Sequence, residues 1–278
     1  MKKIYKLMVA CLMGLTLTNC NDFLDYNPTA VIDEDKAFSE PEKMVNAAYA
    51  MLGDCWFSYP FNLFPYGDIT SDDCLKGGSG TTDTGYHPFE IWSTLTATTP
   101  GEMDELWYRL YCAVSRCNRA LVSLERNGVA KLGSDISEQR IAEVKFLRAH
   151  FYYKLLTVFR QVPWIDEVAY LNNSIEQIPN DEFSYEGLFG KVIADFETAY
   201  NVLPEKQSDG GRVNKIAAAA YLAKCYLGLA WGDGYEATTG VNHINEEYMR
   251  KVVIYTDEVA NSDYDYLEDF GDIFLPDY

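Results

Sequence analysis

The sequence predicts a mainly α fold in which helical hairpins stack side by side, as in a tetratricopeptide-like solenoid. Three observations support this prediction. Apolar residues recur at helical spacing along most of the chain, no alternating strand pattern of useful length is present, and small side chains in one segment favour close helix packing. A strict tetratricopeptide consensus is absent, so the prediction depends on the succession of amphipathic helices. One aromatic-rich stretch without helical periodicity predicts an irregular loop layer.

The first three helices are predicted by one capping signal and by their apolar faces. Ser39 and Glu42 have capping-box spacing and place the first helix over roughly 40–52. A second helix over about 102–125 carries an apolar stripe. A third over 137–161 is apolar on two sides, which predicts burial on both. It should end before Pro163, because the residue preceding a proline avoids helical backbone.

Three further helices follow in the second half of the chain. Ser184 caps a helix that ends at Pro204. An alanine-rich helix runs from Lys215 to Trp231, where small side chains let neighbouring helix axes approach closely. After a Gly-rich connection over residues 232–242, the sixth helix begins at Asn245 with two glutamates in its first turn.

Residues 1–19 have the features of a lipoprotein signal peptide. Three lysines flank or precede an apolar run over residues 7–18, which is shorter than the roughly 20 residues needed to span a bilayer. The run ends in Leu17-Thr18-Asn19-Cys20, which resembles a bacterial lipobox. In that interpretation Cys20 is lipidated, becomes the mature N-terminus and anchors the protein. The alternative is an ordinary secretory signal followed by a chance cysteine.

The charge balance excludes one class of partner. The whole chain has 23 basic and 42 acidic side chains and a net charge of −19. Residues 1–19 hold three lysines and no acid, so their removal makes the net charge −22. A chain this acidic repels nucleic-acid phosphates. At 48% hydrophobic residues it also has ample apolar surface to form a core.

The cysteines show neither a disulfide framework nor a metal site. Five remain after Cys20, an odd number without zinc-type spacing. Cys112 and Cys117 project from different sides of one predicted helix and should not pair. Cys225 is expected to be a small buried thiol. A bridge between Cys55 and Cys74 remains an open alternative.

Several segments, taken in order, resemble the SusD/RagB family of nutrient-uptake lipoproteins. They are CNDFLD at residues 20–25 followed by Pro28, AEVKFLRAHFYY at 142–153 with Phe159 and Pro163, IADFE at 193–197 with Leu-Pro at 203–204, and GRVNK at 211–215 leading into the alanine-rich helix. The resemblance implies a non-enzymatic, surface-exposed outer-membrane lipoprotein built on tetratricopeptide-like helices. Such proteins capture oligosaccharides, or in RagB-like cases peptides, and cover a SusC-like TonB-dependent barrel.

The resemblance also implies domain limits and one departure. Residues 20–278 form a SusD-like region that is expected to be incomplete at its C-terminus, because the likeness is still running at residues 275–278. Glycan-binding members can carry aromatic platforms after an acidic stretch such as residues 71–73. Here Lys76-Gly77-Gly78 follows instead, which argues against a starch-like ligand.

The candidate ligand-binding residues lie in the aromatic-rich layer over residues 53–101. Sugar rings present apolar C–H faces that stack on Trp and Tyr, while their hydroxyls bond to carboxylates and backbone. The candidates chosen on this chemistry are Trp56, Tyr66, Asp72, Tyr86 and Trp92. The alternative for each aromatic residue is packing in the core. Asp72 with Asp73 could instead hold a structural calcium ion, although a solvated turn is the stronger expectation and no cofactor is indicated.

Other functions have weaker support. No metalloprotease, serine-hydrolase or phosphate-loop motif is present. His150 is expected to be a satisfied core residue, and His87 and His243 have no indicated catalytic partner. A helical glycoside hydrolase would need a carboxylate pair that no spacing singles out. A lipid-anchored helical-repeat adaptor is the remaining alternative to ligand capture.

Overall fold

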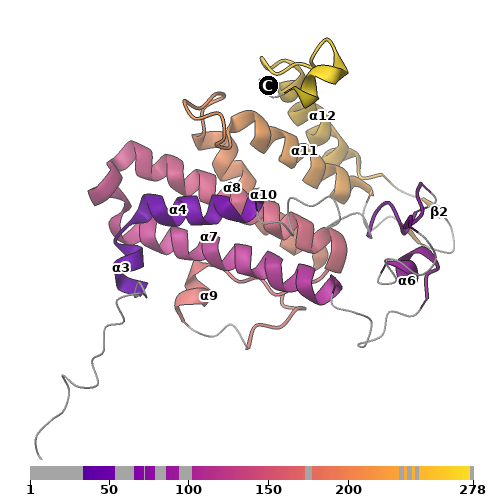
Figure 1. Ribbon diagram of the computed structural model, residues 1–278, viewed down its shortest axis with the longest axis horizontal. Helices are drawn as coiled ribbons and strands as arrows, with labels where there is room; N and C mark the ends of the chain where they lie inside the picture. The colour runs from indigo at the N-terminus through magenta and orange to yellow at the C-terminus, as the bar shows by residue number, and fades with distance from the viewer. Residues whose placement is uncertain are drawn as a thin grey trace, which may run out of the picture. The chain divides into compact units, whose positions relative to one another are not determined.

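The fold is built from long helices that pack against their neighbours in chain order (Figure 1). The computed structural model describes residues 34–53, 66–71, 73–78, 86–93, 102–172, 177–231, 235–236, 240–241 and 244–275. The longer helices are α4 (Pro41–Tyr49), α7 (Glu102–Leu132), α8 (Ser134–Phe159), α10 (Tyr185–Val202), α11 (Lys215–Trp231) and α12 (Glu246–Ala260). The short elements are α3 (Glu34–Phe38), η1 (Ala50–Gly53), α6 (His87–Glu90), α9 (Glu167–Leu171), η4 (Phe270–Phe274), β1 (Tyr235–Glu236) and β2 (Gly240–Val241).

Consecutive helices form the hairpins that the sequence predicts. α7 packs on α8, α8 on α10, α10 on α11 and α11 on α12, while α4 packs against α7 and α8. In Figure 1, α7 and α8 are the two long helices joined by a tight turn at one end. A single residue, Gly133, separates them, and its φ of 85° is in the left-handed region that glycine tolerates best. The mainly α, tetratricopeptide-like prediction is confirmed.

α8 lies at the centre of the core and is buried on two sides, as its sequence predicts. Phe146 packs edge-on against Phe196 of α10 and Tyr221 of α11, with ring centroids 5.2 and 5.4 Å apart. On its other side Tyr152 stacks on Trp164 at 4.2 Å. Aromatic pairs of this geometry add about 0.5–1.5 kcal/mol each beyond the burial of their area. Much of the chain's aromatic content is therefore core.

Most predicted helix ends are observed. The Ser184 hydroxyl accepts a hydrogen bond from the Gly187 N–H at 3.1 Å, and Asn245 caps α12 by accepting from the Tyr248 N–H. α8 ends at Phe159, four residues before Pro163. The following connection over residues 232–242 contains the short antiparallel pair β1–β2, which the sequence analysis did not predict.

The capping box at Ser39 and Glu42 is not formed, so that prediction is wrong. α4 begins at Pro41, its N-cap position is Glu40, and no side chain caps it. A proline at the first helical position needs no partner for an N–H that it lacks. The Glu42 carboxylate is instead held by the guanidinium groups of Arg140 and Arg212, which are stronger donors than a backbone N–H.

The cysteine predictions can be compared with the described residues. Cys117 and Cys225 are fully buried, and Cys112 and Cys74 are also free thiols. The open alternative of a bridge from Cys74 is therefore not realised in the structure; Cys55 lies outside the described residues. The signal peptide at residues 1–19 lies outside them as well. Among the helices that are described, none has the length and apolar character to cross a membrane.

Candidate functional site

Three of the six predicted site residues fall where the structure gives a description. Cys20, Trp56 and Asp72 lie outside the described residues, and their roles stay predictions. Tyr66, Tyr86 and Trp92 lie in the two described segments of the loop layer, 66–78 and 86–93. Their environments differ, and this difference separates packing residues from exposed ones.

Tyr66 packs into the protein. Its ring lies 5.3 Å from the buried ring of Phe89 in α6, at an interplanar angle of 85°, and it also packs against the core. Ile69, three residues later, is 1% exposed. The contacts of Tyr66 therefore tie the 66–78 segment to α6 and favour packing over ligand contact at this position.

Trp92 presents an open aromatic surface. Its side chain is 76% exposed and its φ is 51°, and the preceding residue, Ile91, is also exposed. Tyr86 is half-buried at the start of α6. An exposed indole held on a turn is the kind of surface on which a sugar ring stacks. Of the described candidates, Trp92 has the most exposed ring, and its role in ligand contact stays a prediction.

The neighbourhood of Cys74 is acidic. Desolvation and the carboxylates of Asp68, Asp73 and Glu90 raise the pKa of its thiol, so it remains protonated and poorly nucleophilic at neutral pH. In the described ranges, no group of three or more His, Cys, Asp or Glu side chains is placed to hold a metal ion. The calcium alternative for Asp72 and Asp73 stays untested.

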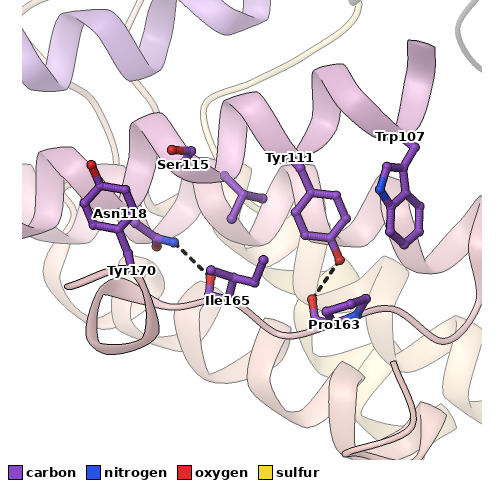
Figure 2. A pocket seen from close by; sticks show the side chains of 8 residues that line it. Trp107, Tyr111, Ser115, Asn118, Pro163, Ile165 and Tyr170 are labelled. Carbon is purple, nitrogen blue, oxygen red and sulfur yellow. Dashed lines mark hydrogen bonds between the residues drawn. The ribbon is translucent and has the colours of Figure 1, made fainter. Parts of the chain in front are cut away.

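A cavity of about 310 Å³ lies on another part of the molecule, between α7, α9 and the segment that joins α8 to α9 (Figure 2). Its lining is mostly aromatic and aliphatic: Trp107, Tyr111, Val114, Ser115, Asn118, Pro163, Ile165 and Tyr170. Figure 2 shows Asn118 and Tyr170 at one end, Trp107 at the other, and Tyr111 with Pro163 between them. None of the three described candidates, Tyr66, Tyr86 and Trp92, is among these lining residues.

Hydrogen bonds fix the wall of the cavity. The Tyr111 hydroxyl donates to the Pro163 carbonyl at 2.7 Å, and the Asn118 amide donates to the Ile165 carbonyl at 2.9 Å. Behind them, the Tyr152 hydroxyl accepts from the Ile165 N–H at 2.6 Å. Burial raises the pKa of Tyr111, so its phenol stays a neutral donor. These bonds satisfy buried backbone groups of the 163–165 segment and hold it against α7.

A buried ion-pair network supports the same wall. The Arg148 guanidinium is 4% exposed and makes two bonds to Asp195, at 2.7 and 3.0 Å. It also donates to the side-chain amide oxygen of Asn118 at 3.1 Å and pairs with Glu167 at the start of α9. Burial alone would lower the pKa of Arg148, but Asp195 and Glu167 outweigh burial and raise it, so the cation persists.

α9 is a five-residue helix held by specific partners. Asp166 caps it by accepting from the N–H groups of Val168 and Ala169, at 3.1 and 2.9 Å. Glu167, in its first turn, is held by Arg148. A helix this short has little stability of its own, so these contacts position Tyr170 at the cavity.

A second buried network joins α4, α8 and the segment before α11. Glu143 is fully buried and accepts bonds from Arg140 at 2.7 Å, Arg212 at 2.8 Å and Tyr49 at 3.0 Å. Glu42 accepts a hydrogen bond from each of the two arginines, from Arg140 at 2.9 Å and from Arg212 at 2.7 Å. The buried carboxylate is thus surrounded by charge-assisted hydrogen bonds, as buried ions require.

The two networks explain most of the sequence segments that carry the family resemblance. Glu143 and Arg148 come from AEVKFLRAHFYY, Asp195 from IADFE, and Arg212 from GRVNK. Glu143, Arg148 and Asp195 are buried and Arg212 is half-buried, and they bond to one another within each network. The motifs therefore encode the scaffold of the fold rather than a ligand site.

The sequence contained a signal for the cavity that the sequence analysis missed. A second face of α7 lies beside the apolar stripe that predicted this helix. Its residues recur at helical spacing: Trp107, Tyr111, Val114, Ser115 and Asn118. That face becomes a cavity wall only because α9 and the 163–165 segment are placed opposite it. Their placement depends on long-range bonds from Arg148 and Tyr152, which no local pattern reveals.

Comparisons with known proteins identify the family. A SusD-like family model described as "Starch-binding associating with outer membrane" matches residues 22–227. A SusD-like protein of Bacteroides ovatus is 25% identical over 97% of this chain and 46% of its own length. A SusD-like protein of Formosa agariphila is 28% identical over 82% of this chain and 43% of its own length. This chain thus spans less than half the length of these curated relatives.

Solved structures show the same fold. A laminarin-binding SusD-like protein superposes with a TM-score of 0.63 at 21% identity, covering 84% of this chain and 47% of that one. Surface glycan-binding protein A of Bacteroides thetaiotaomicron, solved with laminarihexaose, gives 0.62 at 24% identity, covering 85% and 46%. The family model covers well over half of the chain, and the fold and the buried networks agree with it. This protein therefore belongs to the SusD-like family.

Proposed function

We propose that this protein is a non-enzymatic, lipid-anchored glycan-binding protein of the outer membrane. It captures oligosaccharides at the outer surface and delivers them to a SusC-like TonB-dependent transporter. The observation that carries the proposal is the SusD-like family match over residues 22–227. Relatives of the same fold were solved with laminarihexaose and with a xylogluco-oligosaccharide, which supports a glycan as the ligand class.

The chemistry of the chain favours a neutral ligand. A net charge of −19 for the whole sequence, or −22 without residues 1–19, repels anionic polymers held by charge alone. Trp92 offers an exposed indole for stacking, and stacking needs no charge on the sugar. Recognition would then be equilibrium binding by stacking and hydrogen bonds.

Isothermal titration calorimetry tests the proposal. The soluble chain starting after Cys20 is titrated with laminarin-, xyloglucan- and starch-derived oligosaccharides and with a peptide pool, and the sugars are analysed afterwards by chromatography. We expect saturable heat with at least one glycan and no change in its chain length. Shortened products would identify a hydrolase instead, and binding of peptides alone would identify a RagB-like protein. No binding to either class would favour the adaptor alternative.

Trp92→Ala provides the matched test of the loop layer. We expect it to weaken glycan binding by about fivefold to tenfold, because an aromatic contact of this kind contributes about 1 kcal/mol. Trp164→Ala is not a suitable comparison because Trp164 is buried. Trp231→Ala is the suitable control, because Trp231 is 46% exposed at the end of α11. This substitution should leave glycan binding unchanged.

A further inference from the structure

The cavity between α7 and α9 is separate from the loop residues on which the proposed function depends. Its volume of about 310 Å³ lies at the lower end of the range for small-molecule sites. A space of this size suits one ring rather than an extended oligomer. Its outer walls carry the aromatic rings of Trp107 and Tyr170 at opposite ends (Figure 2).

The lining excludes charged occupants. No charged side chain is among the described residues that line the cavity. Arg148, which bonds the side chain of Asn118, is itself paired with Asp195 and Glu167. A charged ligand would lose its hydration without gaining a counter-ion, which costs several kcal/mol. The occupant is therefore neutral.

Two polar groups of the lining are uncommitted. Asn118 and Tyr111 use their polar atoms on Ile165, Arg148 and Pro163. Among the described residues, the Ser115 hydroxyl and the Trp107 indole N–H have no protein partner. An aliphatic side chain filling the cavity would cut both groups off from water and leave them unsatisfied, which is unfavourable. A ligand with apolar faces and hydroxyls on its edge leaves both groups able to form hydrogen bonds, with the ligand or with water.

The cavity is also preorganised. The 163–165 segment is bonded to Tyr111, Asn118 and Tyr152, and α9 is capped by Asp166. A ligand entering this space needs to order little of the protein, which preserves affinity for a small group.

We propose that this cavity is a second carbohydrate site, which holds one neutral pyranose ring. The ring lies with its C–H groups against the aromatic and aliphatic walls and with a hydroxyl bonded to Ser115. The identity of the ring as one residue of a captured oligosaccharide rests on the proposed function; occupancy of the cavity by a single ring does not.

Saturation-transfer difference NMR on the soluble chain tests the site directly, with the methyl glycosides of glucose, galactose, mannose and xylose as probes. We expect saturable transfer to the ring protons of at least one glycoside. Ser115→Leu places an apolar side chain in the cavity, removes the hydroxyl and should abolish that transfer. Thr157→Leu is the matched control, because Thr157 is exposed on α8 and does not line the cavity, and it should leave the transfer unchanged.

The outcomes separate this inference from the proposed function. Glycoside transfer that is absent, or equal in the wild type and in Ser115→Leu, overturns the cavity site, even if calorimetry finds oligosaccharide binding that depends on Trp92. Transfer lost only in Ser115→Leu supports the site, even if no oligosaccharide binds and the proposed function fails. Ser115-dependent transfer to a leucine or phenylalanine side chain of a test peptide, with none to any glycoside, also overturns it.

Discussion

At the scale of single residues, buried charge is the dominant feature of the molecule. Arg148 bonds Asp195 from α10, Asn118 from α7 and Glu167 from α9. One guanidinium thus joins three elements to α8, using the fork geometry that Arg has and Lys lacks. A lysine at this position would keep the charge but reach fewer of these acceptors.

Arg148→Met should lower the free energy of unfolding by about 3–5 kcal/mol, because it leaves the Asp195 carboxylate buried without a counter-ion. Urea denaturation followed by circular dichroism measures this change. Adding Asp195→Leu to the same variant should recover part of the loss. Arg250→Met is the matched control, since its pair with Glu246 is exposed on both sides, and it should change little. Equal effects of the two single variants would contradict the role of Arg148.

His150 gives the stability a pH dependence. Burial, together with Lys154 and Lys224, lowers the pKa of His150 to about 3, and its Nδ1 is 2.7 Å from the Tyr221 hydroxyl. The folded protein therefore keeps a neutral imidazole where the unfolded chain, with a pKa near 6.5, takes up a proton. This contribution is fully present above pH 6.5 and is lost progressively as the pH falls toward 3.

Between pH 7 and pH 5.5 the wild type should lose about 1 kcal/mol more unfolding free energy than His150→Gln, which cannot take up the proton. Urea titrations of both proteins at the two pH values give the comparison. The same loss in both proteins would show that other groups cause the pH dependence.

At the scale of elements, two glycines inside helices have opposite roles. Gly128 of α7 is buried against α8, where an added Cβ would lie 3.3 Å from the Ser137 Cβ and even nearer its hydroxyl. Gly190 of α10 is exposed, with nothing within 4 Å of such an atom. The first glycine allows two helices to approach, whereas the second only weakens its own helix.

Gly190→Ala should raise the free energy of unfolding by about 0.5–1 kcal/mol through better helix propensity. Gly128→Ala should lower it, because α7 and α8 must separate slightly at their crossing. Thermal melts of the two variants against the wild type decide the signs. An equal gain in unfolding free energy at both positions would mean that the α7–α8 interface accommodates a methyl group at Gly128.

At the scale of the whole molecule, the sequence predicted the long helices well and the site only in part. The cap at Ser184 and the stop at Pro204 placed α10 closely, the alanine-rich run placed α11, and Asn245 placed the start of α12. The short helices α6 and α9 were missed, since α9 depends on Asp166 and on the distant Arg148 rather than on its own five residues. The capping box predicted from Ser39 and Glu42 does not form, because Glu42 bonds Arg212, 170 residues away. Tyr66 and Trp92 have similar local sequence signals, and only tertiary contacts distinguish them.

The predicted lipid anchor of this protein rests on Cys20, within the Leu17-Thr18-Asn19-Cys20 segment. In a bacterial host that processes lipoproteins, the full chain should take up labelled palmitate and fractionate with membranes, and Cys20→Ala should abolish both. Cys11→Ala, within the same predicted signal peptide, is the matched control and should keep the label. Label retained by Cys20→Ala would refute lipidation at this cysteine.

The bonds of Arg212 to Glu42 and Glu143 have a consequence for the order of folding. The α7–α8 hairpin joins two helices that are consecutive in the chain, so its own interface can form once residues 102–159 are free. Glu143, by contrast, lacks one of its counter-ions until Arg212 has been synthesised. Glu42 of α4 pairs with the same arginine. We therefore expect the first helix in the array to dock among the last, so that a chain emerging N-terminus first stays open at that end until most of it has been delivered.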